Sequence, residues 1–240
     1  MKLKQSQSSP HPPIGQMVLG EWRDRERASI EMVRGGAVVD GNVAYFMGDN
    51  GETCSYNSTT KRWSKLPKCP CVSSSLVVIR GILTAIGGSK NVLHRDLEDK
   101  LLSIVNIKWV EHFPPMPTKR YCAAAVTTKQ HLIVAGGRSK LYNRLNTVEV
   151  MDIQTLVWSK RASLPHPYSR ASATTCGDHL YMLGGNDKDG PTKLVLTCSL
   201  TKLLQSCSET LSDPVWCRIC LLYTSPSPRD ATLSRMPSSA

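Results

Sequence analysis

Three pairs of glycines follow short apolar runs, and such pairs could form a loop that binds phosphate. The segments LTAIGGSK, LIVAGGRSK and LYMLGGNDK contain Gly87–Gly88, Gly136–Gly137 and Gly184–Gly185. A phosphate loop requires a strand, a glycine-rich loop and then a helix, with a GxGxxG or GK[ST] pattern. The residues after the three pairs, SKNVLHRD, RSKLYNRL and NDKDGPTK, differ freely and open no amphipathic helix. The pairs therefore indicate a repeated structural requirement rather than a nucleotide site.

Cysteine and histidine side chains could bind metal or act as nucleophiles, but their spacing does not favour either role. A zinc site usually combines two well-spaced cysteine pairs, whereas this chain has CPC at 69–71 and CRIC at 217–220. The histidines are isolated, without an HExxH motif, and the sequence has no G-x-S-x-G elbow. We therefore expect no catalytic residue, no metal site and no cofactor.

The composition excludes several classes of protein. The chain has 240 residues, 40% of them hydrophobic, and contains no apolar run of about 18 residues that would span a membrane. The formal net charge is +11, but the basic residues are scattered and aromatic residues make up only 6%, so a diffusely basic surface is favoured over nucleic-acid binding. Nine cysteines and no signal peptide indicate reduced thiols. We expect a cytoplasmic protein that contacts neither membrane nor nucleic acid.

The glycine pairs belong to a longer repeat. Gly87, Gly136 and Gly184 open the three pairs and follow one another at a nearly constant interval. An earlier unit, AYFMGDN, has Gly48 followed by aspartate. Tryptophans recur with a similar period, at Trp63, Trp109 and Trp158 and, after a longer gap, at Trp216. A fixed period of this length indicates a solenoid, a propeller or an array.

Each unit has the pattern of a hairpin followed by two further strands. Residues 34–50 and 170–186 align without a gap, and each has the pattern of a strand, a tight turn and a strand that ends at glycine. The third unit is interpreted as having two extra residues in its turn, at 127–131. A variable loop then precedes a third strand, and a fourth strand carries tryptophan. The segment 194–211 is the exception, and we expect a helical turn or two there, inside a long loop.

Four strands in a repeat of this length are typical of a β-propeller blade. The succession of an apolar run, Gly-Gly, a variable loop and tryptophan resembles the kelch repeat, and three units carry both glycines. The resemblance implies an all-β, kelch-type β-propeller with about four four-stranded blades, which we expect to be part of a larger, six-bladed propeller. The expected boundaries are a disordered segment at 1–17, the propeller at 18–220 with units at 31–66, 72–112, 119–161 and 169–216, and a disordered, non-native tail at 221–240.

The repeated residues have a structural explanation. The strand that ends at a glycine pair is expected to be the innermost of its blade, where the pair permits positive φ or a close approach of two backbones. A tryptophan can pack between adjacent blades while its indole N–H finds a partner. The residues assigned these structural roles are Gly48, Gly87, Gly88, Gly136, Gly137, Gly184, Gly185, Trp63, Trp109, Trp158 and Trp216.

Function is expected on the loops that follow the glycine pairs, because a propeller is a rigid support for its loops. Arg34, Arg120 and Arg170 precede the first glycine of their units at similar distances along the chain, and are interpreted as equivalent positions on one face. The resemblance implies that arginines at this place bind acidic peptide segments, for which guanidinium groups are suited. The alternative is that each arginine only bridges neighbouring blades. Further candidates in the loops are Arg138, Asn186, Asp187 and Lys188.

These features favour a protein-protein interaction module without enzymatic activity. The resemblance implies two settings, substrate recognition for a ubiquitin-ligase adaptor or binding to actin. The protein partner would then be a cullin-ligase substrate or actin, or another protein with an acidic segment. The alternative from another class is an enzyme built on the propeller, such as a metal-dependent oxidase.

Overall fold

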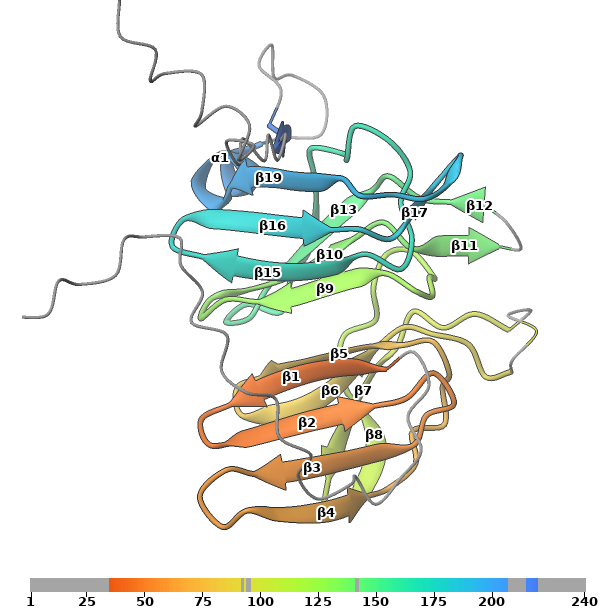
Figure 1. Ribbon diagram of the computed structural model, residues 1–240, viewed down its shortest axis with the longest axis vertical. Helices are drawn as coiled ribbons and strands as arrows, with labels where there is room; N and C mark the ends of the chain where they lie inside the picture. The colour runs from red at the N-terminus through yellow and green to blue at the C-terminus, as the bar shows by residue number, and fades with distance from the viewer. Residues whose placement is uncertain (1–34, 92, 94–95, 141–142, 207–214, 220–240) are drawn as a thin grey trace, which may run out of the picture.

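Four antiparallel sheets follow one another along the chain (Figure 1). The computed structural model describes residues 35–91, 93, 96–140, 143–206 and 215–219. The expected disordered segments at 1–17 and 221–240 lie outside the described residues. Each sheet has four strands, and we refer to the sheets as blades 1 to 4 in chain order. The prediction of an all-β propeller with four four-stranded blades is confirmed.

The strands of the blades are short. Blade 1 contains β1 (Gly36–Asp40), β2 (Val43–Met47), β3 (Thr53–Asn57) and β4 (Arg62–Leu66). Blade 2 contains β5 (Ser75–Ile79), β6 (Ile82–Ile86), β7 (Leu101–Val105) and β8 (Lys108–Phe113). Blade 3 contains β9 (Ala124–Thr127), β10 (His131–Ala135), β13 (Val148–Asp152) and β14 (Trp158–Arg161). Blade 4 contains β15 (Ser172–Cys176), β16 (His179–Leu183), β19 (Val195–Ser199) and β20 (Cys217–Ile219).

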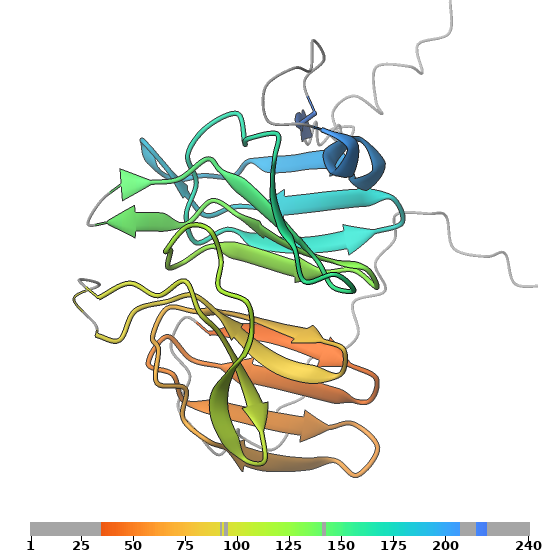
Figure 2. The same ribbon diagram turned by 180° about the vertical axis from the view of Figure 1, so that it is seen from behind.

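The first strand of every blade lies innermost. Strand β5 packs beside both β1 and β9, and β15 packs beside β9. The four inner strands therefore lie next to one another, and the sheets radiate from them, as the front and rear views show (Figures 1 and 2). The strand that ends at the glycine pair is the second from the inside. The prediction that it is an innermost strand is wrong, because the first strand of each hairpin occupies that place.

The four inner hairpins have the same length. In each, the first residue of the inner strand pairs with a residue eleven positions later: Gly36 with Met47, Ser75 with Ile86, Ala124 with Ala135, and Ser172 with Leu183. The prediction of two extra residues in the turn of the third unit is therefore wrong. This turn lacks glycine and is closed instead by Thr128, whose backbone N–H donates to the His131 carbonyl oxygen and whose hydroxyl accepts the His131 N–H.

Two small arms and one helix complete the described structure. The arms are two-stranded, made by β11 (Arg138–Lys140) with β12 (Asn143–Arg144) and by β17 (Asn186–Asp187) with β18 (Gly190–Pro191). Helix α1 (Leu200–Gln205) begins at Ser199, whose hydroxyl caps the Lys202 N–H. The helical turn expected in 194–211 is confirmed, but the long loop around it is not, since β19 occupies the start of that segment.

The hydrophobic core consists of layers between successive blades. In β10, Leu132 and Val134 pack in a cluster with Val77 and Ile79 of blade 2, whereas Ile133 packs in a cluster with residues of blade 4. Because successive side chains of a strand point to opposite faces, the continuous apolar run HLIVA is explained by burial on both sides. Blades 2 and 3 are therefore packed on both faces, whereas blades 1 and 4 each pack against one neighbouring blade.

The tryptophans join each blade to the one before it. The indole N–H of Trp109 donates to the Pro67 carbonyl oxygen at 2.8 Å, and that of Trp158 donates to Pro114 at 3.2 Å. Trp216 repeats the contact with Ala162 at 3.2 Å. Each acceptor lies just after the outermost strand of the preceding blade. The prediction that tryptophan packs between blades and finds a partner for its N–H is confirmed for these three residues.

Candidate functional site

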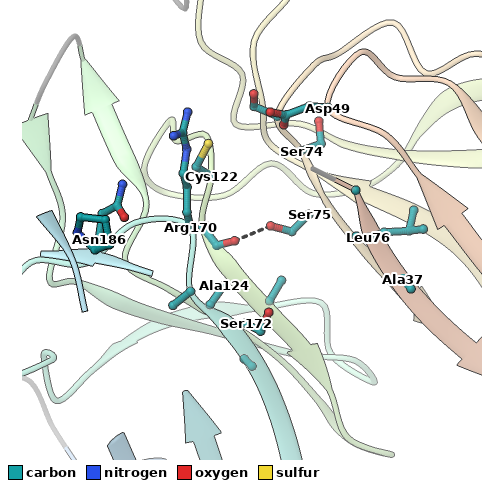
Figure 3. A pocket seen from close by; sticks show the side chains of 18 residues that line it. Ala37, Asp49, Ser74, Ser75, Leu76, Cys122, Ala124, Arg170, Ser172 and Asn186 are labelled. Atoms are coloured by element: carbon teal, nitrogen blue, oxygen red, sulfur yellow. Dashed lines mark hydrogen bonds between the residues drawn. The ribbon is translucent and has the colours of Figure 1, made fainter. Parts of the chain in front are cut away.

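The starts of the four inner strands surround a cavity of about 630 Å³. We call it the mouth pocket. Its walls near the strands are built of small residues such as Ala37, Ser75 and Ala124, and its rim carries polar side chains (Figure 3). Most of the inner-strand residues that line the space are glycine, alanine or serine, with Leu76 as the larger exception, and small side chains leave the space open. A volume of this size lies within the range of ligand-binding pockets.

A chain of backbone hydrogen bonds forms part of the rim. The Ser73 N–H donates to the Asp49 carbonyl oxygen at 3.2 Å, the Cys122 N–H to Ser73 at 2.9 Å, and the Arg170 N–H to Cys122 at 2.8 Å. Ser73, Cys122 and Arg170 all have positive φ, at 56°, 51° and 60°. Such a backbone is uncommon outside glycine. Its recurrence at three equivalent positions shows that the entry into the inner strands of blades 2, 3 and 4 imposes it.

Arg170 is the exposed cation of the mouth pocket. Its side chain lies beside the Cys122 thiol (Figure 3). Its hydrogen bond to Cys122 raises the pKa of the guanidinium, and the nearby Asp49 carboxylate has the same effect to a lesser degree. Arg170 makes no ion pair with another described residue. Its charge therefore remains available to a ligand that enters the pocket.

Arg120 does not occupy the equivalent position. Since the hairpins have equal lengths, Arg170 corresponds to Cys122 and Ser73, whereas Arg120 lies two residues earlier and corresponds to Tyr168. The same hydrogen bond identifies that pair, since Gly88 donates to the Arg120 carbonyl oxygen and Gly137 to that of Tyr168. The alignment of Arg120 with Arg170 is therefore wrong. The interval from Arg120 to Gly136 is two residues longer than that from Arg170 to Gly184. These two residues lie before the inner strand and not in the turn of the hairpin.

The Arg120 side chain is a buried structural element with 1% exposure. Its Nη2 atom lies 2.9 Å from Glu149 Oε2, and both side chains are inaccessible to solvent. Nη1 donates to the Gly136 carbonyl oxygen at 2.8 Å and to that of Thr147 at 3.3 Å. The Thr118 hydroxyl donates to the same carboxylate. Burial lowers the pKa of Arg120, and Glu149 opposes this effect.

The other predicted site residues are distributed around the pocket. Asn186 lines it, and its backbone pairs with Ser169. Arg138 donates from Nε to the Ser169 hydroxyl at 3.2 Å, so its side chain holds the start of blade 4. Asp187 accepts the Asp189 N–H within the β17–β18 arm, where Lys188 is exposed at the tip. Arg34 lies outside the described residues. The structure thus brings Arg170 and Asn186 together at the pocket.

The glycines allow two backbones to come close. Gly87 has φ of +60°, and a Cβ there would lie 2.4 Å from the Arg120 carbonyl oxygen. Blade 1 achieves the same approach differently. Its Gly51, with φ of +82°, faces the Cys69 carbonyl oxygen at the same distance, inside a short turn closed by the Gly51 N–H and the Gly48 carbonyl oxygen. The position after Gly48 carries the Asp49 side chain instead of a second glycine.

Asp49 is the pocket residue that the sequence interpretation missed. It lines the pocket at the position where the other units have a second glycine. Its place in the repeat was visible in the sequence, but it was treated only as a departure from the pattern. A charged residue that replaces a repeated glycine beside a loop face was the signal that could have identified it.

Two kinds of feature are missing from the part of the chain that the structure describes. No group of three or more His, Cys, Asp or Glu side chains within it is arranged to hold a metal ion. Of the helical residues described, none belongs to a helix long and apolar enough to cross a membrane.

Known proteins share parts of this sequence. Residues 119–165 match the family described as Kelch motif. The chain is 30% identical over 153 residues to acyl-CoA-binding domain-containing protein 5 of Arabidopsis thaliana, covering 60% of this chain and 23% of that protein. It is 26% identical over 190 residues to Kelch-like protein terF of Aspergillus terreus, covering 74% of this chain and 39% of that protein. The chain therefore spans less than half the length of these curated relatives.

A solved structure shares the fold. The structure of YjhT superposes with a TM-score of 0.67 at 15% sequence identity, covering 83% of this chain and 68% of that one. At this identity the likeness concerns the fold alone. The matched motif and the kelch-like relative support a kelch-repeat family for this chain, and the structural neighbour supports the propeller fold.

Proposed function

We propose that this chain is a protein-interaction module whose mouth pocket receives an acidic segment of a partner protein. Kelch propellers generally bind protein partners. The observation that carries the proposal is the exposed Arg170 guanidinium, held beside a cavity of about 630 Å³ without an ion pair to another described residue. A guanidinium group can bind a carboxylate through two parallel hydrogen bonds. Asn186 adds an amide that can donate a further bond.

The rim suits recognition because its backbone is already ordered. The hydrogen bonds that link Ser73, Cys122 and Arg170 join three blades, so a ligand would not have to order this part of the rim. Preorganisation lowers the entropy lost on binding and thereby favours affinity. The same rigidity places the charged group at a fixed height above the inner strands.

The partner would determine the cellular role of the module. We propose a cytoplasmic role, either as the substrate-recognition part of a ubiquitin-ligase adaptor or as an actin binder. Co-sedimentation with filamentous actin separates the two. Retention of the protein in the supernatant at saturating filament concentration would contradict the actin role.

Binding without catalysis is part of the same proposal. The rival is a metal-dependent oxidase built on the propeller. Metal analysis of the purified protein distinguishes the two, and stoichiometric copper or zinc would favour the enzyme. We expect less than one-tenth of an equivalent of either metal.

The test of binding compares two matched arginine variants. Arg170→Ala removes the pocket cation, and Arg62→Ala removes an exposed arginine from the outermost strand of blade 1. Purified partner should be captured by the wild type and by Arg62→Ala, but at least fivefold less by Arg170→Ala. Equal capture by all three proteins would remove the pocket from the proposal.

A second readout uses the thiol at the rim. Cys122 is half-buried beside Arg170, so a segment bound there should shield it. We expect a bound partner to slow alkylation of Cys122 while leaving the exposed Cys176 unaffected. Unchanged alkylation of Cys122 at saturation would show that the partner binds elsewhere.

A further inference from the structure

The mouth pocket carries charges of both signs. Asp49 and Arg170 both line it, and they come from blades 1 and 4. Figure 3 shows them on opposite sides, with Ser74 near Asp49 and Asn186 near Arg170. No salt bridge joins Asp49 to any described basic side chain. The two opposite charges therefore line the same cavity without a salt bridge between them.

The backbone fixes the separation of these charges. Asp49 and Arg170 are the two ends of the hydrogen-bonded chain that passes through Ser73 and Cys122. Hydrogen-bonded chains lie about 4.8 Å apart. Three such links therefore hold the two backbones no more than about 14 Å apart. A single short segment of a partner can therefore reach both groups.

Asp49 is specific to blade 1. The equivalent positions in the other blades are Gly88, Gly137 and Gly185, where a Cβ would approach neighbouring atoms at 2.2, 2.9 and 2.7 Å. In blade 1 this position carries the Asp49 side chain, which lines the pocket. A ring of identical repeats would line every wall of the pocket with the same side chains and the same charge. This departure adds a negative group to one wall only.

We propose that the mouth pocket recognises a peptide segment that carries an acidic and a basic side chain on the same face, with the acidic group bound by Arg170 and the basic group by Asp49. This proposal rests on the proposed function and narrows its partner from any acidic segment to a segment with both charges. In an extended peptide, residues two positions apart point the same way and lie about 7 Å apart. A Glu-x-Lys motif therefore fits the requirement.

The experiment measures the affinity of blocked peptides, acetylated and amidated so that their termini carry no charge. The three probes are Gly-Glu-Gly-Lys-Gly, Gly-Glu-Gly-Gln-Gly and Gly-Gln-Gly-Lys-Gly, titrated into the full chain by calorimetry or NMR. The wild type should bind the first probe threefold to fivefold more tightly than the second, as expected for one partly exposed charge pair. The third probe should bind most weakly.

Variants identify the group responsible for the preference. Asp49→Asn keeps the shape of the side chain and should abolish the preference for the lysine-containing probe, while leaving the affinity for the acidic probe unchanged. Asp40→Asn, an exposed aspartate at the far end of β1, should keep the preference. Arg170→Ala should lower the affinity of the chain for both glutamate-containing probes.

The other possible outcomes distinguish a failure of the two-charge proposal from a failure of the proposed function. Equal wild-type affinity for the two glutamate-containing probes, or a preference that survives in Asp49→Asn, overturns the two-charge proposal; acidic binding that still depends on Arg170 would leave the proposed function intact. Absence of binding by every probe overturns the two-charge proposal, whereas the proposed function is judged by partner capture. If free zwitterionic amino acids bind as tightly as the first probe, the ligand is a small molecule and the peptide proposal is wrong.

Discussion

Arg120 and Arg170 are the same residue type at neighbouring blade entries, yet they have opposite environments. Arg120 is 1% exposed and lies against Glu149 and three other oxygen-bearing groups. Arg170 is exposed at a cavity and contacts a thiol. Relative to the inner strand that follows it, Arg120 lies two residues earlier than Arg170. Position relative to the blade joint, rather than residue type, decides whether an arginine is structural or available to a ligand.

The position of Arg120 is filled differently at each described blade entry. Blade 2 has the buried Cys71 in the same hydrophobic cluster as Leu102, and blade 4 has the buried Tyr168 in the same cluster as Leu196. Of these three described entries, only that of blade 3 has a buried ion pair in this place. This position at the entry to a blade can therefore be filled either by an apolar side chain or by a charged side chain that is paired. A buried pair is often no more stabilising than apolar residues of similar volume, so its presence does not by itself show a gain in stability.

The largest expected effect follows from breaking this pair. Arg120→Ala leaves the Glu149 carboxylate buried without its cation, and also removes the donor to the Gly136 carbonyl oxygen. We expect a loss of about 3 to 5 kcal/mol in the free energy of unfolding, the usual cost when one partner of a buried pair is removed. Urea unfolding followed by fluorescence measures it. A loss below about 1 kcal/mol would contradict the buried environment, since it is typical of an exposed pair.

A double variant separates the pair from its packing. Arg120→Met with Glu149→Leu reproduces the apolar arrangement of the other blades. It should be more stable than either single variant by about 2 kcal/mol, since no unpaired charge remains. It should not fully regain wild-type stability, because the Gly136 and Thr147 carbonyl oxygens lose a donor. Additive losses in the double variant would show that the two groups do not interact.

The next effect concerns the backbone of Arg120 rather than its side chain. In Gly87→Ala the new Cβ would lie 2.4 Å from the Arg120 carbonyl oxygen, at a φ of +60°. We expect a loss of more than about 2 kcal/mol, from the steric overlap and the strained φ together. Gly177→Ala is the matched control, with φ of +56° and no atom within 4 Å. It should lose only about 1 kcal/mol, and equal losses would mean that the close approach does not matter.

The blades could be recognised from the sequence because their geometry repeats. Glycines at the ends of strands and tryptophans that reach the preceding blade recur wherever the joint recurs. The buried ion pair could not be recognised, because it occurs once and joins two residues far apart in the sequence, Arg120 and Glu149. The turn of blade 3 contains no glycine, unlike Gly41, Gly81 and Gly177 in the other three hairpins. Without that marker, the register of Arg120 was misplaced.

The pocket was predictable only in part, for a related reason. Arg170 could be identified because its unit aligned without a gap with the first unit. Asp49 could not be assigned a role from spacing, since its place at the pocket depends on residues of the other blades that line the same cavity. Contacts between blades decide such features, and no local pattern encodes them.

A smaller effect is expected from the contact that repeats at every joint. Trp109→Phe retains an aromatic ring but loses the hydrogen bond to the Pro67 carbonyl oxygen. We expect a loss of about 1 kcal/mol, measured by thermal unfolding. Trp63→Phe is the control, because its ring packs against Phe46 and Tyr56 and no indole hydrogen bond joins it to a described residue. An equal or larger loss in Trp63→Phe would show that the smaller ring, and not the lost hydrogen bond, accounts for the effect.

The smallest effect on stability should come from Arg170→Gly, which completes the contrast with Arg120. Glycine relieves the positive φ of 60°, a gain of about 1 to 2 kcal/mol, but adds roughly 0.5 to 1 kcal/mol of conformational entropy to the unfolded chain. The free energy of unfolding should therefore change by no more than about 1 kcal/mol, and upward if at all. Loss of partner binding in a variant that unfolds at the same urea concentration as the wild type would assign Arg170 to recognition. A large loss of stability would instead make it a second structural arginine, and the distinction between the two positions would fail.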